Sequence, residues 1–150
     1  MDFGNYSIRG LKAWRTDDGG GYELSLLCGG KKVATVLEEG RGGETRFYWA
    51  NPEAEAVFDK YLATLPIIEI YQGHEIKVDG GVFVEELVGV YEINKRFKRL
   101  CKSKIVFTLK DKDKDDTTYN TINRPFNQVT KDLMIAKYGD NLKEIINERF

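Results

Sequence analysis

Clusters of glycine divide the first fifty residues into short segments. The spacing of these clusters constrains the possible folds more than any other feature of the chain. The clusters lie at residues 19–21, 29–30 and 40–43. Glycine adopts the positive φ angles of tight turns at little cost. Between two clusters, residues 22–27 alternate apolar and polar side chains, as a half-buried strand does. The pattern predicts an antiparallel meander of three or four strands, over residues 6–16, 22–27, 32–39 and 44–50.

A helix is expected to begin after Asn51. Asparagine caps free backbone N–H groups, and proline, here Pro52, suits the first helical position. Pro66 blocks continuation, so this helix should end near residue 65. Its expected apolar stripe consists of Val57, Phe58, Tyr61, Leu62 and Leu65.

A second, longer helix is expected over residues 80–103. It follows residues 67–79, which are typical of one strand or of two short strands joined at Gln72–Gly73. Its inward-facing residues recur at i, i+4 and i+7 within an arc of about 80°. This expected stripe consists of Phe83, Leu87, Val90, Asn94, Phe97 and Cys101.

The last third of the chain predicts a strand, a charged loop, an extended segment and two C-terminal helices. The strand covers residues 104–110, and the helices cover residues 127–139 and 140–150. The predicted fold class is therefore α+β: an N-terminal antiparallel β-meander packed with a long central helix and two C-terminal helices.

A chain of 150 residues is the usual size of one domain, and we expect a single α+β domain over residues 1–150. A net charge of −1 argues against a strongly cationic coat for nucleic acid. Cys28 and Cys101 lie far apart, so reduced thiols and a cytoplasmic location are the simplest interpretation. We find no signal-peptide pattern, and no window approaches the ~18 apolar residues of a membrane span.

Residues 94–104, NKRFKRLCKSK, contain six basic residues and no acidic one. One interpretation is a patch that contacts phosphates or an acidic partner. The other is the solvated end of a helix, where the dipole favours cations and long side chains cover the edge of the core. Further positive charge lies elsewhere in the sequence, at Lys31–Lys32 and at Arg41 and Arg46. A fold that brings these segments beside residues 94–104 would enlarge the patch. The candidate binding residues are Lys95, Arg96, Arg99, Lys102, Lys104, Arg41 and Arg46.

Two other segments resemble ion sites. Residues 111–116, DKDKDD, place carboxylates at alternate positions, but the glycine and the final glutamate of an EF-hand are missing, which favours a solvated turn. Residues 78–82, VDGGV, lie between a predicted strand and a helix. Free N–H groups there are one way to hold an anion, and an ordinary helix start is the other interpretation.

Few side chains suggest catalysis. His74 is the one histidine and should be exposed in a turn, while both cysteines lie on apolar faces and are typical of core residues. Paired carboxylates are frequent, but the sequence places no pair across a cleft. The aromatic residues Trp14, Tyr48 and Trp49 are either core or a recognition surface.

A hairpin with a GxGG loop and an aromatic exit strand occurs together with a distinctive C-terminal ending. The stretches are GGKKVATVLEEGRGGETRFYWA, CKSKIVFTLK and RPFNQVTKDLMIAKYGDNLKEIINERF. They are similar to a loose group of small, mostly uncharacterised phage and prophage proteins. The resemblance implies a phage accessory protein that acts in the host cytoplasm, and it supplies no catalytic residues. Such proteins are often non-enzymatic inhibitors of host or defence proteins.

We therefore expect a non-enzymatic binding protein that inhibits or sequesters a host or defence-system component, without cofactor or metal. One alternative is a nucleic-acid binder that uses the basic helix end. A second is a sponge for an anionic nucleotide signal, held by arginines and glycine loops at a dimer interface. A third is a small hydrolase or nuclease, which needs carboxylates that converge on a metal.

Overall fold

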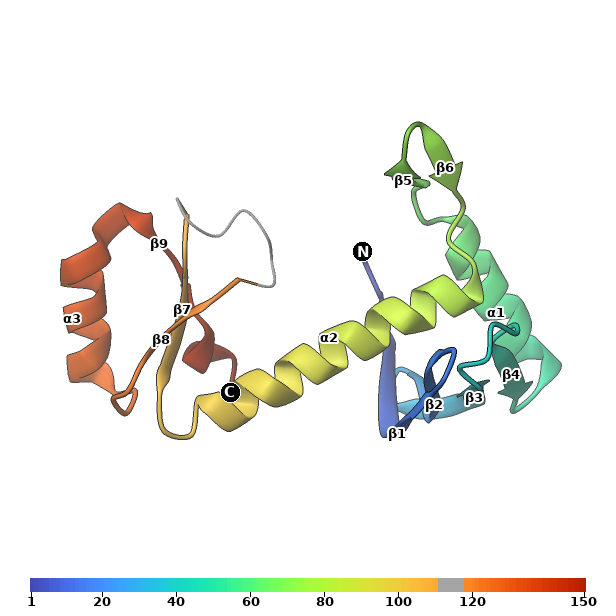
Figure 1. Cartoon of the computed structure of the whole chain (residues 1–150), viewed down its shortest axis with the longest axis horizontal. Helices are drawn as coiled ribbons and strands as arrows, with labels where there is room; N and C mark the ends of the chain where they lie inside the picture. Colours follow the sequence, from blue (N-terminus) through green and yellow to red (C-terminus); the bar gives the residue numbers. More distant parts are fainter. Residues whose placement is uncertain (111–117) are drawn as a thin grey trace. The chain divides into compact units, whose positions relative to one another are not determined.

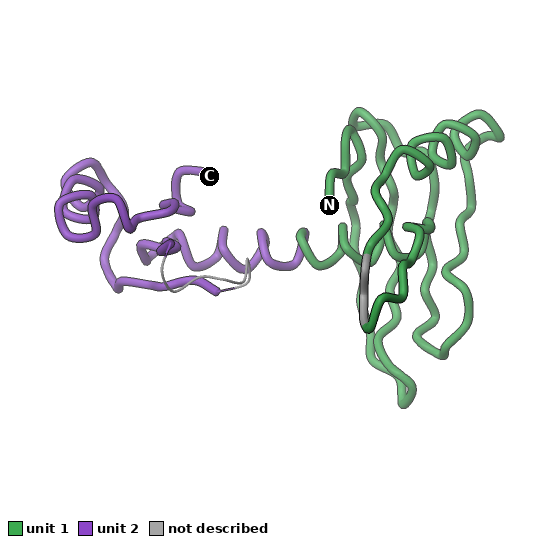
Figure 2. Tube along the Cα trace, turned by 90° about the horizontal axis from the view of Figure 1, so that it is seen from above, with its two compact units in different colours: residues 1–90 green, residues 91–150 purple. Residues whose placement is uncertain are grey.

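The computed structural model describes residues 1–110 and 118–150, apart from the side chains of residues 69–71. Figure 1 shows its strands and helices in chain order. The chain divides into two compact units, unit 1 (Met1–Val90) and unit 2 (Tyr91–Phe150), which Figure 2 shows in different colours. Helix α2 (Gly80–Leu100) belongs to both units. The single domain expected over residues 1–150 stays a prediction.

Unit 1 contains the meander that the glycine clusters predict. Its antiparallel strands lie in the order β1-β2-β3-β4 (Figure 1). They are β1 (Tyr6–Thr16), β2 (Gly19–Cys28), β3 (Lys31–Glu38) and β4 (Arg46–Trp49). The register of β1 against β2 shifts between Arg9 and Lys12, where Gly10 has a φ angle of 68°. Glycine reaches this angle without a Cβ clash, which permits the bulge.

Helix α1 (Pro52–Ala63) packs against β3 and β4. It begins as predicted, because the Asn51 side chain accepts a hydrogen bond from the backbone N–H of Ala54 at 2.8 Å. Phe58 and Leu62 are buried, but Val57 is 58% exposed. The predicted stripe was therefore too wide at Val57, since a helix that packs on a single sheet buries only a narrow strip of its surface.

Aromatic rings form the centre of unit 1. Phe58 is 1% exposed and lies within contact of four other rings. The centroid distances are 5.1 to 5.8 Å, to Tyr6, Phe47, Trp49 and Phe83. Edge-to-face and tilted pairs of this kind stabilise a core beyond the area that they bury.

Two short strands precede helix α2. They are β5 (Ile68–Tyr71) and β6 (His74–Ile76), which pair as an antiparallel hairpin around Gln72–Gly73. The backbone N–H of Val82 then donates to the Asp79 carboxylate at 2.8 Å, which caps the start of the helix.

Three of the six residues of the predicted stripe on α2 are buried, and Asn94 and Cys101 are half-buried. Phe83 and Leu87 are buried in unit 1, and Phe97 is buried in unit 2. Val90 is 41% exposed, so its predicted burial is wrong. Val90 is the last residue of unit 1, where the core of that unit ends.

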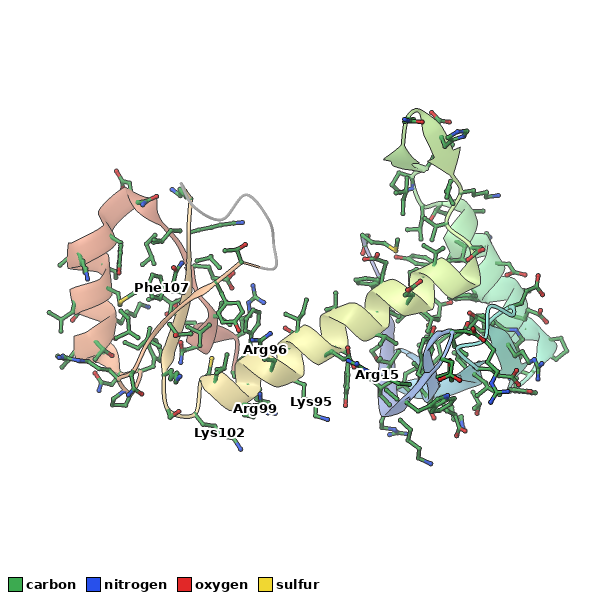
Figure 3. All side chains as sticks on the ribbon, viewed as in Figure 1. Arg15, Lys95, Arg96, Arg99, Lys102 and Phe107 are labelled. Carbon is green, nitrogen blue, oxygen red and sulfur yellow. The ribbon has the colours of Figure 1, made fainter. Side chains whose placement is uncertain are left out.

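Unit 2 is a three-stranded antiparallel sheet with α3 (Gln128–Tyr138) on one side. The strands β7 (Ile105–Leu109), β8 (Asn120–Ile122) and β9 (Leu142–Ile145) lie in the order β8-β7-β9. Side chains alternate along β7. Phe107 (labelled in Figure 3) belongs to a core cluster that includes Met134 of α3, whereas Val106 packs with Phe97 and Ile146 in a second cluster.

The second predicted C-terminal helix, over residues 140–150, is wrong. This segment forms the 3₁₀ helix η1 (Gly139–Asn141), strand β9 and the 3₁₀ helix η2 (Ile146–Arg149). Strand β7 is almost wholly buried and needs a partner on each edge, and β9 supplies one through pairs such as Phe107 with Ile145. Tertiary pairing here overrides the local preference for helix.

Candidate functional site

The predicted basic residues of α2 lie at the C-terminal end of the helix and in the turn that follows. We define the basic helix end as Lys95, Arg96, Lys98, Arg99 and Lys102, all of which are exposed. Lys95 and Arg99 are four positions apart and lie on one face of α2, and Lys102 continues this row from the turn that follows the helix. Figure 3 shows the side chains of Lys95, Arg99 and Lys102 on one side of the ribbon and that of Arg96 on another.

The Arg96 side chain is held against an aromatic ring. Its Cζ atom lies 5.4 Å from the centroid of the Tyr119 ring, a cation–π distance. The Phe97 ring packs edge-on against the same tyrosine, at 5.1 Å and 90°. Tyr119 therefore links the basic surface to the core of unit 2, and Arg96 is more restrained than its charged neighbours.

The charges of the basic helix end are not neutralised by the part of the chain that the structure describes. The ion pairs found there join other residues, such as Lys131 with Glu148 and Arg149 with Glu144. Lys98 and Arg99 also lie in the last turn of α2, where the helix dipole favours positive charge. The row is thus both compatible with a plain helix end and available to an external anion.

A buried asparagine fixes the backbone beneath this surface. Asn147 is 8% exposed, and its Oδ1 accepts a hydrogen bond from the backbone N–H of Val106 at 2.7 Å. Its Nδ2 donates to the backbone carbonyl of Lys104 at 2.8 Å. These bonds tie η2 to the segment that joins α2 to β7, so the basic helix end has a rigid base.

The other predicted binding residues do not join this row. Lys104 is half-buried. Arg41 and Arg46 belong to unit 1, as do Lys31 and Lys32. Arg46 pairs with Glu39 at 3.2 Å, and both side chains are largely exposed. This ion pair partly offsets the positive charge that the sequence suggested there.

Charge is segregated between the two units. Residues 1–90 carry nine basic and fifteen acidic side chains, a net charge of −6. Residues 91–150 carry fourteen basic and nine acidic side chains, a net charge of +5. The overall charge of −1 hides this difference, and unit 2 by itself carries a positive charge that favours an anionic partner.

Unit 1 contains a cavity of about 820 Å³ that sequence analysis missed. Its aromatic lining comes from Tyr22, Phe47, Trp49 and Phe58. Its acidic lining consists of Glu38, Glu44, Glu55, Asp59, Asp79 and Glu85. We call this the acidic cavity. The segment 78–82, which suggested an anion site, lines it through Asp79, Gly80 and Gly81, so its carboxylate surroundings disfavour an anion.

Within residues 1–110 and 118–150, no group of three or more His, Cys, Asp and Glu side chains could hold a metal ion. The segment 111–116, with its alternate carboxylates, lies outside the described residues.

The other reactive side chains have ordinary surroundings. His74 is exposed, as predicted. Cys28 and Cys101 are both half-buried free thiols. Burial raises the pKa of the Cys101 thiol, which makes it a poorer nucleophile. None of the described helices is long and apolar enough to cross a membrane.

In comparisons with known proteins, no protein-family model, no curated protein and no solved structure matches this chain.

Proposed function

We propose that the protein is a non-enzymatic binding protein whose basic helix end docks on an acidic surface of a protein partner. One observation carries this proposal: Lys95, Arg99 and Lys102 form an exposed row that no described carboxylate neutralises. The bonds of Asn147 hold the backbone below the row. Cations presented on a fixed backbone lose less conformational entropy when they bind than cations on a mobile loop.

The proposed partner is a component of the host or of its defence system, in the host cytoplasm, which the protein inhibits or sequesters. The resemblance of the sequence to small phage and prophage proteins supports this choice. Docking on an acidic patch would block whatever normally binds there, so inhibition requires no chemistry. Electrostatic complementarity of this kind contributes mainly specificity and association rate.

Nucleic acid is the second candidate partner, and the net charge of +5 on residues 91–150 favours it. The geometry at Tyr119 favours a protein partner instead. Arg96 lies over this ring and Phe97 packs against it, so the tyrosine offers little free surface for stacking a base. A sponge for an anionic nucleotide would rely on Arg41 and Arg46, and Arg46 is engaged with Glu39.

A pull-down from host cells tests the proposal with matched charge reversals. The test variant carries Lys95→Glu, Arg99→Glu and Lys102→Glu. The control carries Lys12→Glu, Lys31→Glu and Lys32→Glu, three exposed lysines of unit 1. We expect an acidic protein to be retained by the wild type and the control and lost from the test variant. Equal retention by both variants would contradict the proposal.

Mobility-shift titrations distinguish nucleic acid, the second candidate partner, from a protein partner. Single- and double-stranded probes should show no shift at low salt if the partner is a protein. A shift that weakens steeply with salt and disappears in the test variant would instead assign the basic helix end to nucleic acid. Hydrolysis of nucleotides or cleavage of nucleic acid with metal, removed by mutation, would show that the protein is an enzyme.

A further inference from the structure

The acidic cavity has an aromatic wall built by one strand. Phe47 and Trp49 lie two positions apart on β4, so they project from the same face of the sheet. Their rings are stacked, with centroids 5.3 Å apart and planes 11° apart. Both are half-buried and line the cavity, while Phe58 closes its base at 1% exposure. The face of such a ring is electron-rich and attracts cations.

Carboxylates from several elements surround this wall. Glu38 lies at the end of β3, Glu55 and Asp59 lie on α1, and Glu85 lies on α2. Among the described residues that line the cavity, none is basic. The negative charges of the site are therefore not balanced from within its own lining.

One of these carboxylates is fixed in place. The Glu38 side chain accepts hydrogen bonds from the backbone N–H of Gly40 at 3.0 Å and from the Thr45 hydroxyl at 2.8 Å. The negative charges of the site also affect the neighbouring Tyr22. The pKa of Tyr22 is raised to about 12, first by burial and then by the negative charges of Glu38 and Glu85. Both carboxylates therefore lie near enough to the Tyr22 hydroxyl to act on its pKa.

We propose that the acidic cavity binds an organic cation, whose alkylammonium or guanidinium group lies against the Phe47–Trp49 wall and pairs with Glu85 and Glu38. A cation over an aromatic face gains most where water is displaced, and a charge-assisted bond to a carboxylate adds direction. The dispersed carboxylates suit an extended organic cation better than a metal ion, which needs ligands gathered around one point. This site is separate from the basic helix end and selects the opposite charge.

The volume of the cavity fits such a ligand. A volume of about 820 Å³ lies within the ~300–1,000 Å³ that small-molecule sites occupy. Glycines at the start of α2 keep its edge open. A Cβ atom on Gly80 would lie 3.0 Å from the Phe47 ring, and one on Gly81 would lie 3.1 Å from the Thr45 hydroxyl. Two sources supply the required group, a free polyamine and a lysine or arginine side chain of a basic peptide.

Nuclear magnetic resonance of the two tryptophan indole N–H groups tests the proposal in the wild-type chain. Trp49 lines the cavity and Trp14 does not, so Trp14 is an internal control. A Trp14→Phe variant assigns the signals. We expect spermidine, or a short capped peptide that contains arginine and lysine, to shift the Trp49 signal saturably at low salt. The tighter of the two ligands identifies the source, and a neutral diol of similar length should have no effect.

Adjacent glutamates on α2 provide a matched pair of variants. Glu85 lines the acidic cavity, whereas Glu86 lies outside it, and both are exposed. Glu85→Gln should weaken the cation about tenfold, the usual effect of losing one charge-assisted bond, and Glu86→Gln should not. No saturable Trp49 shift, an equal shift with the diol, or equal weakening by both variants would overturn the proposal. None of these outcomes bears on the basic helix end.

Discussion

The buried side chain of Asn147 accepts a hydrogen bond from the backbone N–H of Val106 at 2.7 Å, which joins the last turn of the chain to the central strand of unit 2. Without this bond the N–H of Val106 would be buried without a partner, because Val106 is 0% exposed. The same side chain donates to the carbonyl of Lys104 at 2.8 Å. One polar residue therefore satisfies groups on both sides of the start of β7.

Replacing Asn147 by leucine should lower the free energy of unfolding by about 2–4 kcal/mol, since it leaves a buried donor and a partly buried acceptor without their partner. Urea unfolding followed by circular dichroism measures the change. Asn123→Leu, at an exposed position of the same unit, is the control and should change stability little. Equal losses in the two variants would show that the hydrogen bonds of Asn147 contribute no special stability.

Alkaline pH should destabilise unit 1 through Tyr22. Burial and nearby carboxylates raise its folded-state pKa to about 12 from an ordinary value of 10.0. The protonated ring therefore stabilises the fold fully below pH ~10, and this contribution is lost as the pH rises toward ~12. We expect the Tyr22→Phe variant to lose less stability than the wild type between these values, by on the order of 1–2 kcal/mol.

Unfolding measured at several alkaline pH values checks this expectation. Tyr6 provides a second test, because burial also raises its pKa to about 12. Tyr6→Phe should flatten the same part of the profile. A profile identical to that of the wild type in both variants would mean that neither phenol is held protonated by the fold.

The meander could be predicted from the sequence because its signals are local. Each turn of the sheet depends on glycines next to the strands that it joins, and the register follows from the turn. The identity of β9 could not be predicted in this way. Leu142–Ile145 becomes a strand because Phe107 and its neighbours on β7 offer a free edge, a partner more than thirty residues away in the chain.

The two candidate sites also differ in whether their residues are close together or far apart in the sequence. The basic helix end is a local cluster, so residues 94–104 contain all of its members and indicated it directly. Sequence patterns could not assemble the acidic cavity, because Glu38, Asp59 and Glu85 come from three different elements. One accessible signal was the charge of each half of the chain, since acidic residues are concentrated before residue 90. That signal indicates the sign of a site but not its position.

Substitutions at two glycines of the loop after β3 should distinguish the effect of backbone strain from that of steric crowding. Gly40 and Gly42 both have positive φ angles, of 73° and 76°. A Cβ atom on Gly40 would lie 2.6 Å from the backbone nitrogen of Gly21, whereas a Cβ atom on Gly42 would meet nothing within 4 Å. Gly42→Ala should therefore cost about 1 kcal/mol of stability from strain alone, and Gly40→Ala clearly more. Thermal unfolding of both variants measures the difference, and equal losses would contradict the predicted clash.

Helix α2 contains a glycine whose replacement should stabilise the protein. Gly89 is exposed in the interior of the helix, and a Cβ atom there would meet nothing within 4 Å. Alanine is a better helix former than glycine by about 1 kcal/mol, so Gly89→Ala should raise the free energy of unfolding by up to that amount. Gly81→Ala, in the first turn of the same helix, is the control. Its new methyl group would lie 3.1 Å from the Thr45 hydroxyl, which should cancel the gain.

Because Gly89 directly precedes the last residue of unit 1, the result also tests whether the helix is regular at that point. A loss of stability in Gly89→Ala would mean that α2 is interrupted where the two units share it.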